Sequence, residues 1–490
     1  MKNKLILSAI LLFSFIFYSY KLSSVPSSVY VDEAVTGYNA YSILKTGKDE
    51  NGKILPIYFR YFNAYSPGLY TYSIIPLVKF FGLNTFSIRL LSAISGVFSV
   101  YIFYLLVNIF LKSENKSLIA ALFYSILPWT LFNSRLGYEV MYAAVIFNTG
   151  VYFLYKKLPN ISNIGLLLIS LSTYTSHNQR YLAPLFIIGY FVIIKKPKIK
   201  TLLILLISQI PNLVLVFTPA FWVKNSVFSV KHILLQFITY ISPKTLFFEL
   251  PDIDQQHLIP KISILYWWMV IPLFLGLKKL SPKISKEYRL LIFWAIISLV
   301  PASLTGEFIS IQRALPFLFP VAIIISLGLT QINKILLLIA FPYSLFLLIR
   351  SYFFFLPNEQ YLAWNYGYQQ VSEFSLSHSQ ESILVDNSRN VRNYILPLFY
   401  QKYDPRLYQQ NLGNFISSHY YQAPAQLSTY KYNNLTFGSI KWDKIQNYNY
   451  IVSDGLSISP DQAKEHKLIL IETISTKNNQ TSQEIYKVVK

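Results

Sequence analysis

The segment ALPFLFPVAIIISLGLTQI, residues 314–332, carries no charged side chain and is long enough to cross a bilayer as one helix. Further segments of similar character are separated by short polar connections. They cover residues 5–21, 86–111, 117–133, 140–155, 161–175, 181–194, 201–217, 264–277, 290–304 and 335–355. The sequence therefore predicts an α-helical polytopic membrane protein with about eleven transmembrane helices.

The composition agrees with a chain that is embedded in lipid. Hydrophobic residues make up 53% of the 490 residues and charged residues only 13%, against about 25% in soluble proteins. The absence of cysteine excludes disulfides, iron–sulfur clusters and thiol nucleophiles. The net charge of +21 does not indicate nucleic acid, because the basic residues recur in short groups between apolar segments instead of forming one patch.

The positions of these basic groups predict the topology. They occupy alternate connections: Lys2 and Lys4, Lys112 and Lys116, Lys156 and Lys157, residues 195–200, and residues 278–289. Because lysine and arginine accumulate in cytoplasmic loops, we expect the N-terminus in the cytoplasm. Residues 22–85, 218–263 and those after about 356 are then extracytoplasmic. The first apolar segment is expected to stay uncleaved, because YSYKLSSVPSS offers no small-residue cleavage site.

The C-terminal part of the chain has a different character. ESILVDNS, NYIVSDG, KLILIETIST and EIYKVVK are typical of short strands, and VRNYILPLFYQKY is typical of a helix. We therefore expect two domains. Residues 1–355 form the transmembrane domain with a first outer loop at 22–85, and residues 356–490 form an extracytoplasmic α/β domain.

Charged residues at a membrane boundary are candidates for function because their desolvation is costly. Asp32 and Glu33 follow the first apolar segment and begin a predicted helix that runs to about Leu44. Acidic residues in a first helical turn also stabilise the helix dipole, so a purely structural role is the alternative.

More polar groups are predicted on the same outer face. Arg135 and Glu139 are four residues apart in NSRLGYEV, where they could simply pair. YTSHNQRYLAP contributes His177 and Arg180, and Arg313 precedes the first segment quoted above. Any one of these arginines could instead extend to lipid phosphates. Together, carboxylates and guanidinium groups on one face favour chemistry on an anionic lipid headgroup, because guanidinium binds phosphate bidentately.

The sequence does not support a metal site. Asp32, Glu33, Glu139 and His177 could converge, but no HExxH motif or paired-histidine spacing is present. We expect His177 to form hydrogen bonds and no cofactor to be required. Whether a divalent metal takes part stays open.

Two stretches of the first outer loop resemble a known class of enzymes. VPSSVYVDEAVTGYNAYSILKTGKDENGKILPIYF, residues 25–59, and YSPGLYTYSIIPLVKFFGLNTFSIRLLSAISG, residues 65–96, are similar to the GT-C class of glycosyltransferases. Within that class, the chain looks most similar to the protein O-mannosyltransferase and lipid A aminoarabinose transferase group of bacteria. SRLGYE, YTSHNQRYLAPL and QRALPFLFPVAIIISLGL resemble later segments of the group, and WNYGYQQVSEF resembles the start of its extracytoplasmic domain.

The resemblance implies roles for individual residues. Asp32 matches the catalytic aspartate, Glu33 its acidic neighbour, and Glu139 a second functional carboxylate. The residues expected to contact the donor phosphate are Arg313, Arg180, Arg60 and Arg135, and those expected to contact the substrate are Tyr70, Tyr138 and His177.

One departure from the group concerns the donor. Where the aminoarabinose transferases have a lysine before the proline of the first outer loop, this chain has Tyr65 and Ser66 before Pro67. Phosphate binding would then depend more on arginine, and the identity of the donor stays open.

The activity implied by the resemblance is that of a hexosyl- or pentosyltransferase in the cell membrane. It would move a sugar from a polyprenyl-phosphate-linked donor to an acceptor at the outer face, with inversion. The acceptor could be a protein, a lipid or a polysaccharide. Asp32 would act as general base, and arginines would stabilise the leaving phosphate. The alternative is a polytopic transporter or flippase for lipid-linked glycans, which would place charges near the middle of the membrane.

Overall fold

The computed structural model describes residues 1–156, 159–222, 229–250, 257–280, 285–305, 310–412, 419–422, 429–476 and 478–490. Lys157 and residues 281–284 of the predicted basic connections lie outside the described residues. The chain forms two compact units. The helical unit comprises Met1–Leu22, Ser66–Tyr70 and Arg89–Phe354, and the second unit comprises Ser23–Tyr65, Thr71–Ile88 and Phe355–Lys490. The second unit thus holds most of the predicted first outer loop together with the C-terminal residues.

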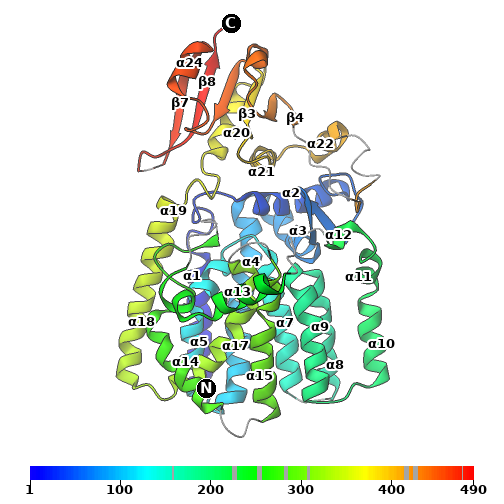
Figure 1. Cartoon of the computed structure of the whole chain (residues 1–490), viewed down its shortest axis with the longest axis vertical. Coiled ribbons are helices and arrows are strands. Elements are labelled where there is room, and N and C mark those ends of the chain that lie inside the picture. The colour runs from blue at the N-terminus through cyan, green and yellow to red at the C-terminus, as the bar shows by residue number, and fades with distance from the viewer. Residues whose placement is uncertain are drawn as a thin grey trace. The chain divides into compact units, whose positions relative to one another are not determined.

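Helices make up the helical unit (Figure 1). They are α1 (Lys2–Ser19), α4 (Thr85–Leu111), α5 (Glu114–Ser125), α6 (Pro128–Ser134), α7 (Glu139–Tyr155), α8 (Pro159–Leu171), η1 (Ser172–Tyr174), α9 (His177–Ile193), α10 (Ile199–Ser208), α11 (Ile210–Leu215), α12 (Pro219–Trp222), α13 (Val230–Ile241), η2 (Lys244–Phe248), η4 (Trp267–Met269), α14 (Val270–Lys279), α15 (Lys286–Ile297), α16 (Val300–Ser303), α17 (Ile311–Leu329), α18 (Lys334–Ile349) and η5 (Arg350–Phe355).

Every apolar segment predicted to span the membrane coincides with one or more of these helices. Among the described residues, four helices are long and apolar enough to cross a membrane: α1, α4, α17, and α18 with its continuation to Glu359. The pair α5 and α6 would add a fifth span, bent by 63°. The bend precedes Pro128, which has no N–H group to continue the hydrogen bonds of α5. The count of about eleven spans stays a prediction.

Glycines allow α14 and α17 to pack closely. A Cβ atom on Gly328 of α17 would lie 1.8 Å from the carbonyl oxygen of Pro272, and one on Gly276 of α14 would lie 1.9 Å from that of Ile324. Because no real Cβ fits at such distances, only glycine permits this approach of the two backbones. Small residues at helix contacts are typical of membrane proteins.

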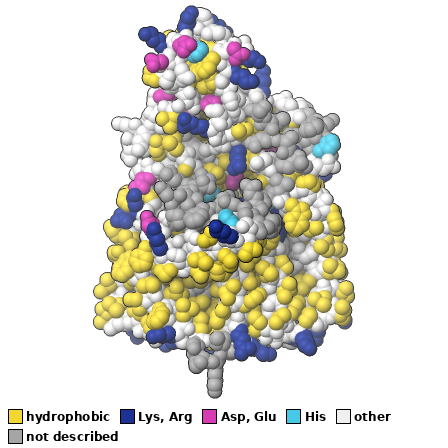
Figure 2. All heavy atoms as spheres, in the orientation of Figure 1, with side chains coloured by type: hydrophobic (Ala, Val, Ile, Leu, Met, Phe, Trp, Pro, Cys, Tyr) yellow, Lys and Arg dark blue, Asp and Glu magenta, His cyan; other side chains and the backbone are white. Residues whose placement is uncertain are grey.

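The surface of the helical unit is apolar. Large hydrophobic side chains are exposed along α1, α10, α14 and α18, and Figure 2 shows hydrophobic side chains covering most of the visible face of this unit. An apolar surface of this extent is expected where a protein contacts lipid. The helical unit therefore has the surface of a membrane-embedded structure.

The basic connections lie at one end of the helical unit. Asn3 Nδ2 donates a hydrogen bond to Glu114 Oε2 at 2.7 Å, so the first two predicted basic groups are neighbours. Tyr155 donates its hydroxyl to the carbonyl oxygen of Glu287 at 3.0 Å, which brings the third group beside the fifth. Figure 2 shows Lys and Arg side chains at the edge of this unit where Figure 1 places the N-terminus. This arrangement agrees with the prediction that the basic connections, which alternate with less basic ones along the chain, all face the same side of the membrane.

The second unit combines helices with strands. Its elements are α2 (Val31–Thr46), β1 (Tyr58–Tyr61), β2 (Ala64–Pro67), α3 (Leu69–Phe81), α19 (Leu356–Glu359), α20 (Tyr368–Ser377), β3 (Ile383–Asp386), α21 (Ile395–Tyr400), α22 (Pro405–Leu412), β4 (Tyr430–Tyr432), β5 (Leu435–Gly438), η6 (Trp442–Asn447), β6 (Tyr450–Ser453), α24 (Pro460–Glu465), β7 (Leu468–Ser475) and β8 (Thr481–Val488). All four strands predicted for the C-terminal part are present as β3, β6, β7 and β8. The hairpin formed by β4 and β5 was not predicted.

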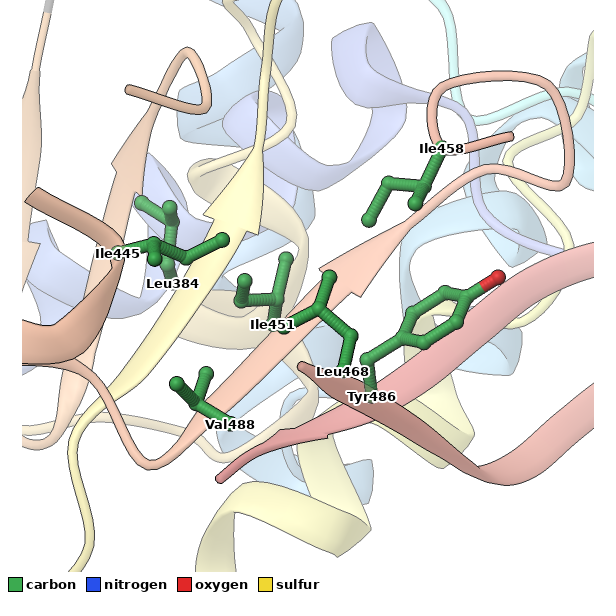
Figure 3. Packing of buried hydrophobic residues seen from close by; sticks show 7 residues of the cluster. All are labelled: Leu384, Ile445, Ile451, Ile458, Leu468, Tyr486 and Val488. Atoms are coloured by element: carbon green, nitrogen blue, oxygen red, sulfur yellow. The ribbon is translucent and has the colours of Figure 1, made fainter. Parts of the chain in front are cut away.

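Six of these strands form a sheet with the order β4-β5-β3-β6-β8-β7. β3 pairs in parallel with both β5 and β6, and the other pairs are antiparallel. Apolar side chains from β3, β6, β7 and β8 pack together with side chains of η6 and of the loop before α24 (Figure 3). These are Leu384, Ile445, Ile451, Ile458, Leu468, Tyr486 and Val488. The C-terminal part therefore has a hydrophobic core of its own.

Candidate active site

The two adjacent acidic residues of the first outer loop begin α2 and have different surroundings. Glu33 is fully buried, and its Oε2 accepts a hydrogen bond from the backbone N–H of Tyr30 at 3.1 Å. The Glu33 carboxylate thus satisfies a backbone donor at the start of its own helix. Asp32, one residue earlier, is half-buried. This arrangement favours a supporting role for Glu33 and leaves Asp32 as the candidate catalytic carboxylate.

Hydroxyl groups form a chain beside the first turn of α2. Thr36 donates its hydroxyl to the backbone carbonyl oxygen of Asp32 at 2.7 Å. The Tyr61 hydroxyl lies 2.9 Å from Thr36 Oγ1 and 3.0 Å from Thr71 Oγ1. These bonds connect α2 to β1 and to α3, and so they hold the backbone that carries Asp32 in one position.

The helical unit contains a pocket where α9 and α17 begin. Two of the predicted phosphate contacts, Arg180 and Arg313, line this pocket together with His177. Asn178 Nδ2 donates to the carbonyl oxygen of Gln312 at 3.0 Å, which joins the first turns of the two helices. The structure thus brings His177 and Arg180 together with Arg313, which lies far from them in the sequence.

Arg180 is oriented by its neighbours. Its Nη1 donates to the carbonyl oxygen of Phe221 at 2.9 Å, its guanidinium carbon lies 4.5 Å from the centre of the Phe221 ring, and its Nη2 contacts His177 Nδ1. Arg180 and Arg313 are both half-buried. None of the described residues that line the pocket is acidic. Two guanidinium groups at the starts of two long helices, where the helix dipoles add positive potential, favour an anionic ligand.

Arg135 has a different environment from the other predicted phosphate contacts. It is fully buried, and its Nη1 donates to the carbonyl oxygens of Phe17 at 3.1 Å and Tyr18 at 2.8 Å. Its guanidinium carbon also lies 5.1 Å from the centre of the Tyr352 ring and 4.9 Å from that of Phe353. These contacts connect the end of α1 to η5, so they favour a structural role for Arg135 over a contact with the donor.

Two of the predicted substrate contacts meet through a serine. The Tyr70 hydroxyl lies 2.9 Å from Ser92 Oγ, which in turn donates to the carbonyl oxygen of Tyr138 at 3.1 Å. Glu139 follows as the first residue of α7 and is half-buried. Tyr70 and Tyr138 are buried. The turn that carries Glu139 is therefore held against α4.

Arg60 belongs to the second unit, where it lines a small pocket with Glu50. Its backbone N–H donates to the Tyr420 hydroxyl at 2.8 Å, and its side chain is only 6% exposed. Tyr394 and Tyr430 line the same pocket and stack on each other, with ring centres 3.7 Å apart. The predicted phosphate contact Arg60 thus has a buried carboxylate and aromatic rings around it.

Asp49 and Glu50 were not predicted as site residues, and both are almost completely buried. Asp49 accepts hydrogen bonds from the backbone N–H groups of Asn51 and Lys53 at 3.0 and 2.8 Å and from the Tyr420 hydroxyl at 2.5 Å. Burial raises the pKa of the Asp49 carboxyl to about 6, although these hydrogen bonds lower it. Burial and the neighbouring Asp49 raise the pKa of Glu50, an effect that the nearby Arg60 opposes.

The described part of the chain contains no group of three or more His, Cys, Asp or Glu side chains that could hold a metal ion. The expectation that no cofactor is required stays a prediction.

One compact unit is built of apolar helices and the other contains an α/β sheet, and the likeness to solved structures shows that this polytopic membrane protein has the GT-C fold. The solved structures that it resembles include ArnT from Cupriavidus metallidurans. The apo structure of ArnT has a TM-score of 0.60 and 11% identity, over 98% of this chain and 97% of that chain. The ArnT structure bound to undecaprenyl phosphate has a TM-score of 0.54 and 12% identity over the same shares.

A further likeness is to the Archaeoglobus fulgidus oligosaccharyltransferase in complex with Zn and sulfate, with a TM-score of 0.48 and 12% identity over 99% of this chain and 73% of that chain. It is too weak to support the assignment, which rests on ArnT. No protein-family model and no curated protein sequence matches the chain. At these identities the likeness to ArnT establishes the fold. The resemblance to the GT-C class that was predicted from the sequence is therefore confirmed for the fold.

Proposed function

We propose that this chain is a glycosyltransferase of the cell membrane that takes a hexosyl or pentosyl group from a polyprenyl-phosphate-linked donor. The observation that carries the proposal is the pocket in which Arg180 and Arg313 lie with His177 at the starts of α9 and α17. This pocket suits a phosphate, and the apolar surface of the helices suits a polyprenyl chain. The structural likeness to ArnT, which has been solved with undecaprenyl phosphate, supports the same class of donor.

The proposed reaction is a single inverting displacement. The acceptor hydroxyl attacks the anomeric carbon of the sugar, and the bond from that carbon to the phosphate oxygen breaks. Asp32 takes the proton of the acceptor, and polyprenyl monophosphate leaves with the electron pair of the broken bond. Arg313 and Arg180 stabilise the charge that develops on the leaving phosphate. The acceptor is a protein, a lipid or a polysaccharide, and no cofactor is proposed.

A transporter or flippase for lipid-linked glycans is the other candidate. Such a protein is expected to hold charges near the middle of its spans, whereas Arg180 and Arg313 lie in the first turns of α9 and α17. We therefore favour the transferase. The two functions differ in the fate of the donor. When the protein is reconstituted with a labelled polyprenyl-phosphate sugar and an acceptor, a transferase releases polyprenyl phosphate, whereas a flippase moves the donor to the other leaflet intact.

We also propose that the N-terminus is cytoplasmic and that residues 356–490 are extracytoplasmic. The basic connections at one end of the helical unit support this orientation. An alkaline phosphatase fused after Lys490 should be active, and a cytoplasmic reporter at the same position should be silent. The reverse pattern would contradict the topology and would place the proposed reaction on the wrong side of the membrane.

A further inference from the structure

We propose that the sheet of the second unit binds a saccharide at the carboxyl ends of β3, β5 and β6. The chain leaves all three strands at the same edge, because β3 pairs in parallel with β5 and with β6. β5 and β6 lie on opposite sides of β3, so the connections that follow these strands diverge at this edge. In open α/β sheets, ligands bind in the crevice that forms at such a point.

The structure has a cavity at this edge, with a volume of about 320 Å³. Side chains at the end of β3 and in the segments that follow the three strands line it. They include Asp386, the last residue of β3, with Ser388 after it, Ser439 and Trp442 after β5, and Ser457 and Gln462 after β6. Ligand pockets begin at about this volume, so the cavity is large enough for a sugar residue.

The walls of the cavity are held by contacts between its own loops. Asp386 accepts hydrogen bonds from the backbone N–H and the hydroxyl of Ser388, at 3.1 and 2.8 Å. Arg389 Nη1 lies 3.3 Å from Asp454 Oδ2, which joins the loop after β3 to the loop after β6. Asp454 also accepts from the hydroxyl of Ser457 at 2.8 Å. A site ordered in this way loses little conformational entropy when a ligand binds.

The chemistry of the lining selects a neutral polyhydroxyl ligand. The lining carries one carboxylate, Asp386, and one guanidinium, Arg389, so its charges favour neither an anion nor a cation. Carboxylate, serine hydroxyl and amide groups can together accept from and donate to sugar hydroxyls. The indole of Trp442 adds an aromatic wall. It packs against the core of the sheet and stacks on His466 with ring centres 4.1 Å apart, so it is fixed in place.

In the proposed reaction, this saccharide is part of the acceptor or of the growing glycan. That assignment rests on the proposed function, whereas binding of the saccharide does not.

The test is binding of the full-length protein in nanodiscs to a glycan array that carries neutral hexoses, N-acetylhexosamines, pentoses and uronic acids. Wild type should bind at least one neutral saccharide. Asp386→Asn and Ser388→Ala should each weaken that binding about tenfold, because each removes a polar contact from the cavity or loosens its wall. Glu472→Gln is the matched control, because it makes the same chemical change on the exposed strand β7 of the same sheet. It should bind as wild type does.

Three results would overturn the inference: no binding by wild type, equal binding by wild type and both cavity variants, or binding of uronic acids alone. The array does not depend on catalysis. Saccharide binding without sugar transfer would therefore count against the proposed function only, and transfer without saccharide binding would count against this site only.

Discussion

Asp32→Asn should abolish sugar transfer while the protein stays folded and inserted in the membrane. The amide cannot take the proton of the acceptor, and loss of a general base typically costs 10²–10⁴-fold in rate. Asp32 is half-buried in the first turn of α2, where Asn is also well tolerated, so the stability should change little. The measurement is the initial rate of transfer by purified protein in nanodiscs, with gel filtration and thermal unfolding as checks of the fold.

Glu33→Gln is the matched control for this experiment. The glutamine side-chain oxygen can still accept the hydrogen bond from the backbone N–H of Tyr30, so the start of α2 should be preserved. We expect a smaller loss of rate than for Asp32→Asn. A rate for Asp32→Asn within about tenfold of wild type would remove Asp32 from the mechanism.

Arg313→Ala should reduce transfer about 10²–10³-fold, the usual effect of removing a group that stabilises charge in the transition state. Arg313→Lys should have a clear but smaller effect, because lysine keeps the charge and loses the planar fork that binds phosphate bidentately. Turnover should be measured against donor concentration for both variants. An arginine that only extends to lipid phosphates would tolerate lysine with near-normal kinetics.

Arg289→Lys provides the control for a change of arginine to lysine in the same unit. Arg289 is exposed in α15 and does not line the pocket of Arg180 and Arg313. The Arg289→Lys substitution should leave the kinetics of transfer unchanged. If Arg313→Lys and Arg289→Lys were equally active, Arg313 would have no role in donor binding.

The sequence was sufficient to predict the apolar helical segments and the strands β3, β6, β7 and β8, because hydrophobic patterns act locally. Runs of apolar residues and short alternating segments form helices and strands wherever they lie in the chain. α17 covers most of the predicted apolar segment 314–332, although it begins at Ile311, and β6 lies within the predicted strand segment NYIVSDG. The bend between α5 and α6 depends on a proline and could also have been anticipated.

The environments of the charged residues could not be predicted, because they depend on distant parts of the chain. Asp49 and Glu50 lie in KDENGK, which is typical of an exposed turn. Both become buried, and Asp49 is bound by Tyr420, 371 positions later in the sequence. Arg135 likewise appears as a surface residue in SRLGYE until α1 and η5 surround it. Arg180 and Arg313 were both predicted to contact the donor phosphate, and the first turns of α9 and α17, which the Asn178–Gln312 hydrogen bond joins, place them in one pocket.

The class of donor is the most direct test of the central claim. Purified protein in nanodiscs should be supplied in parallel with polyprenyl-phosphate sugars and with the corresponding nucleotide sugars, together with membrane acceptors. Free polyprenyl phosphate and glycosylated acceptor should be quantified by mass spectrometry. We predict that the two products appear in equal amounts, and only with the lipid-linked donor. Transfer from a soluble nucleotide sugar in the absence of any lipid carrier would contradict the proposed function.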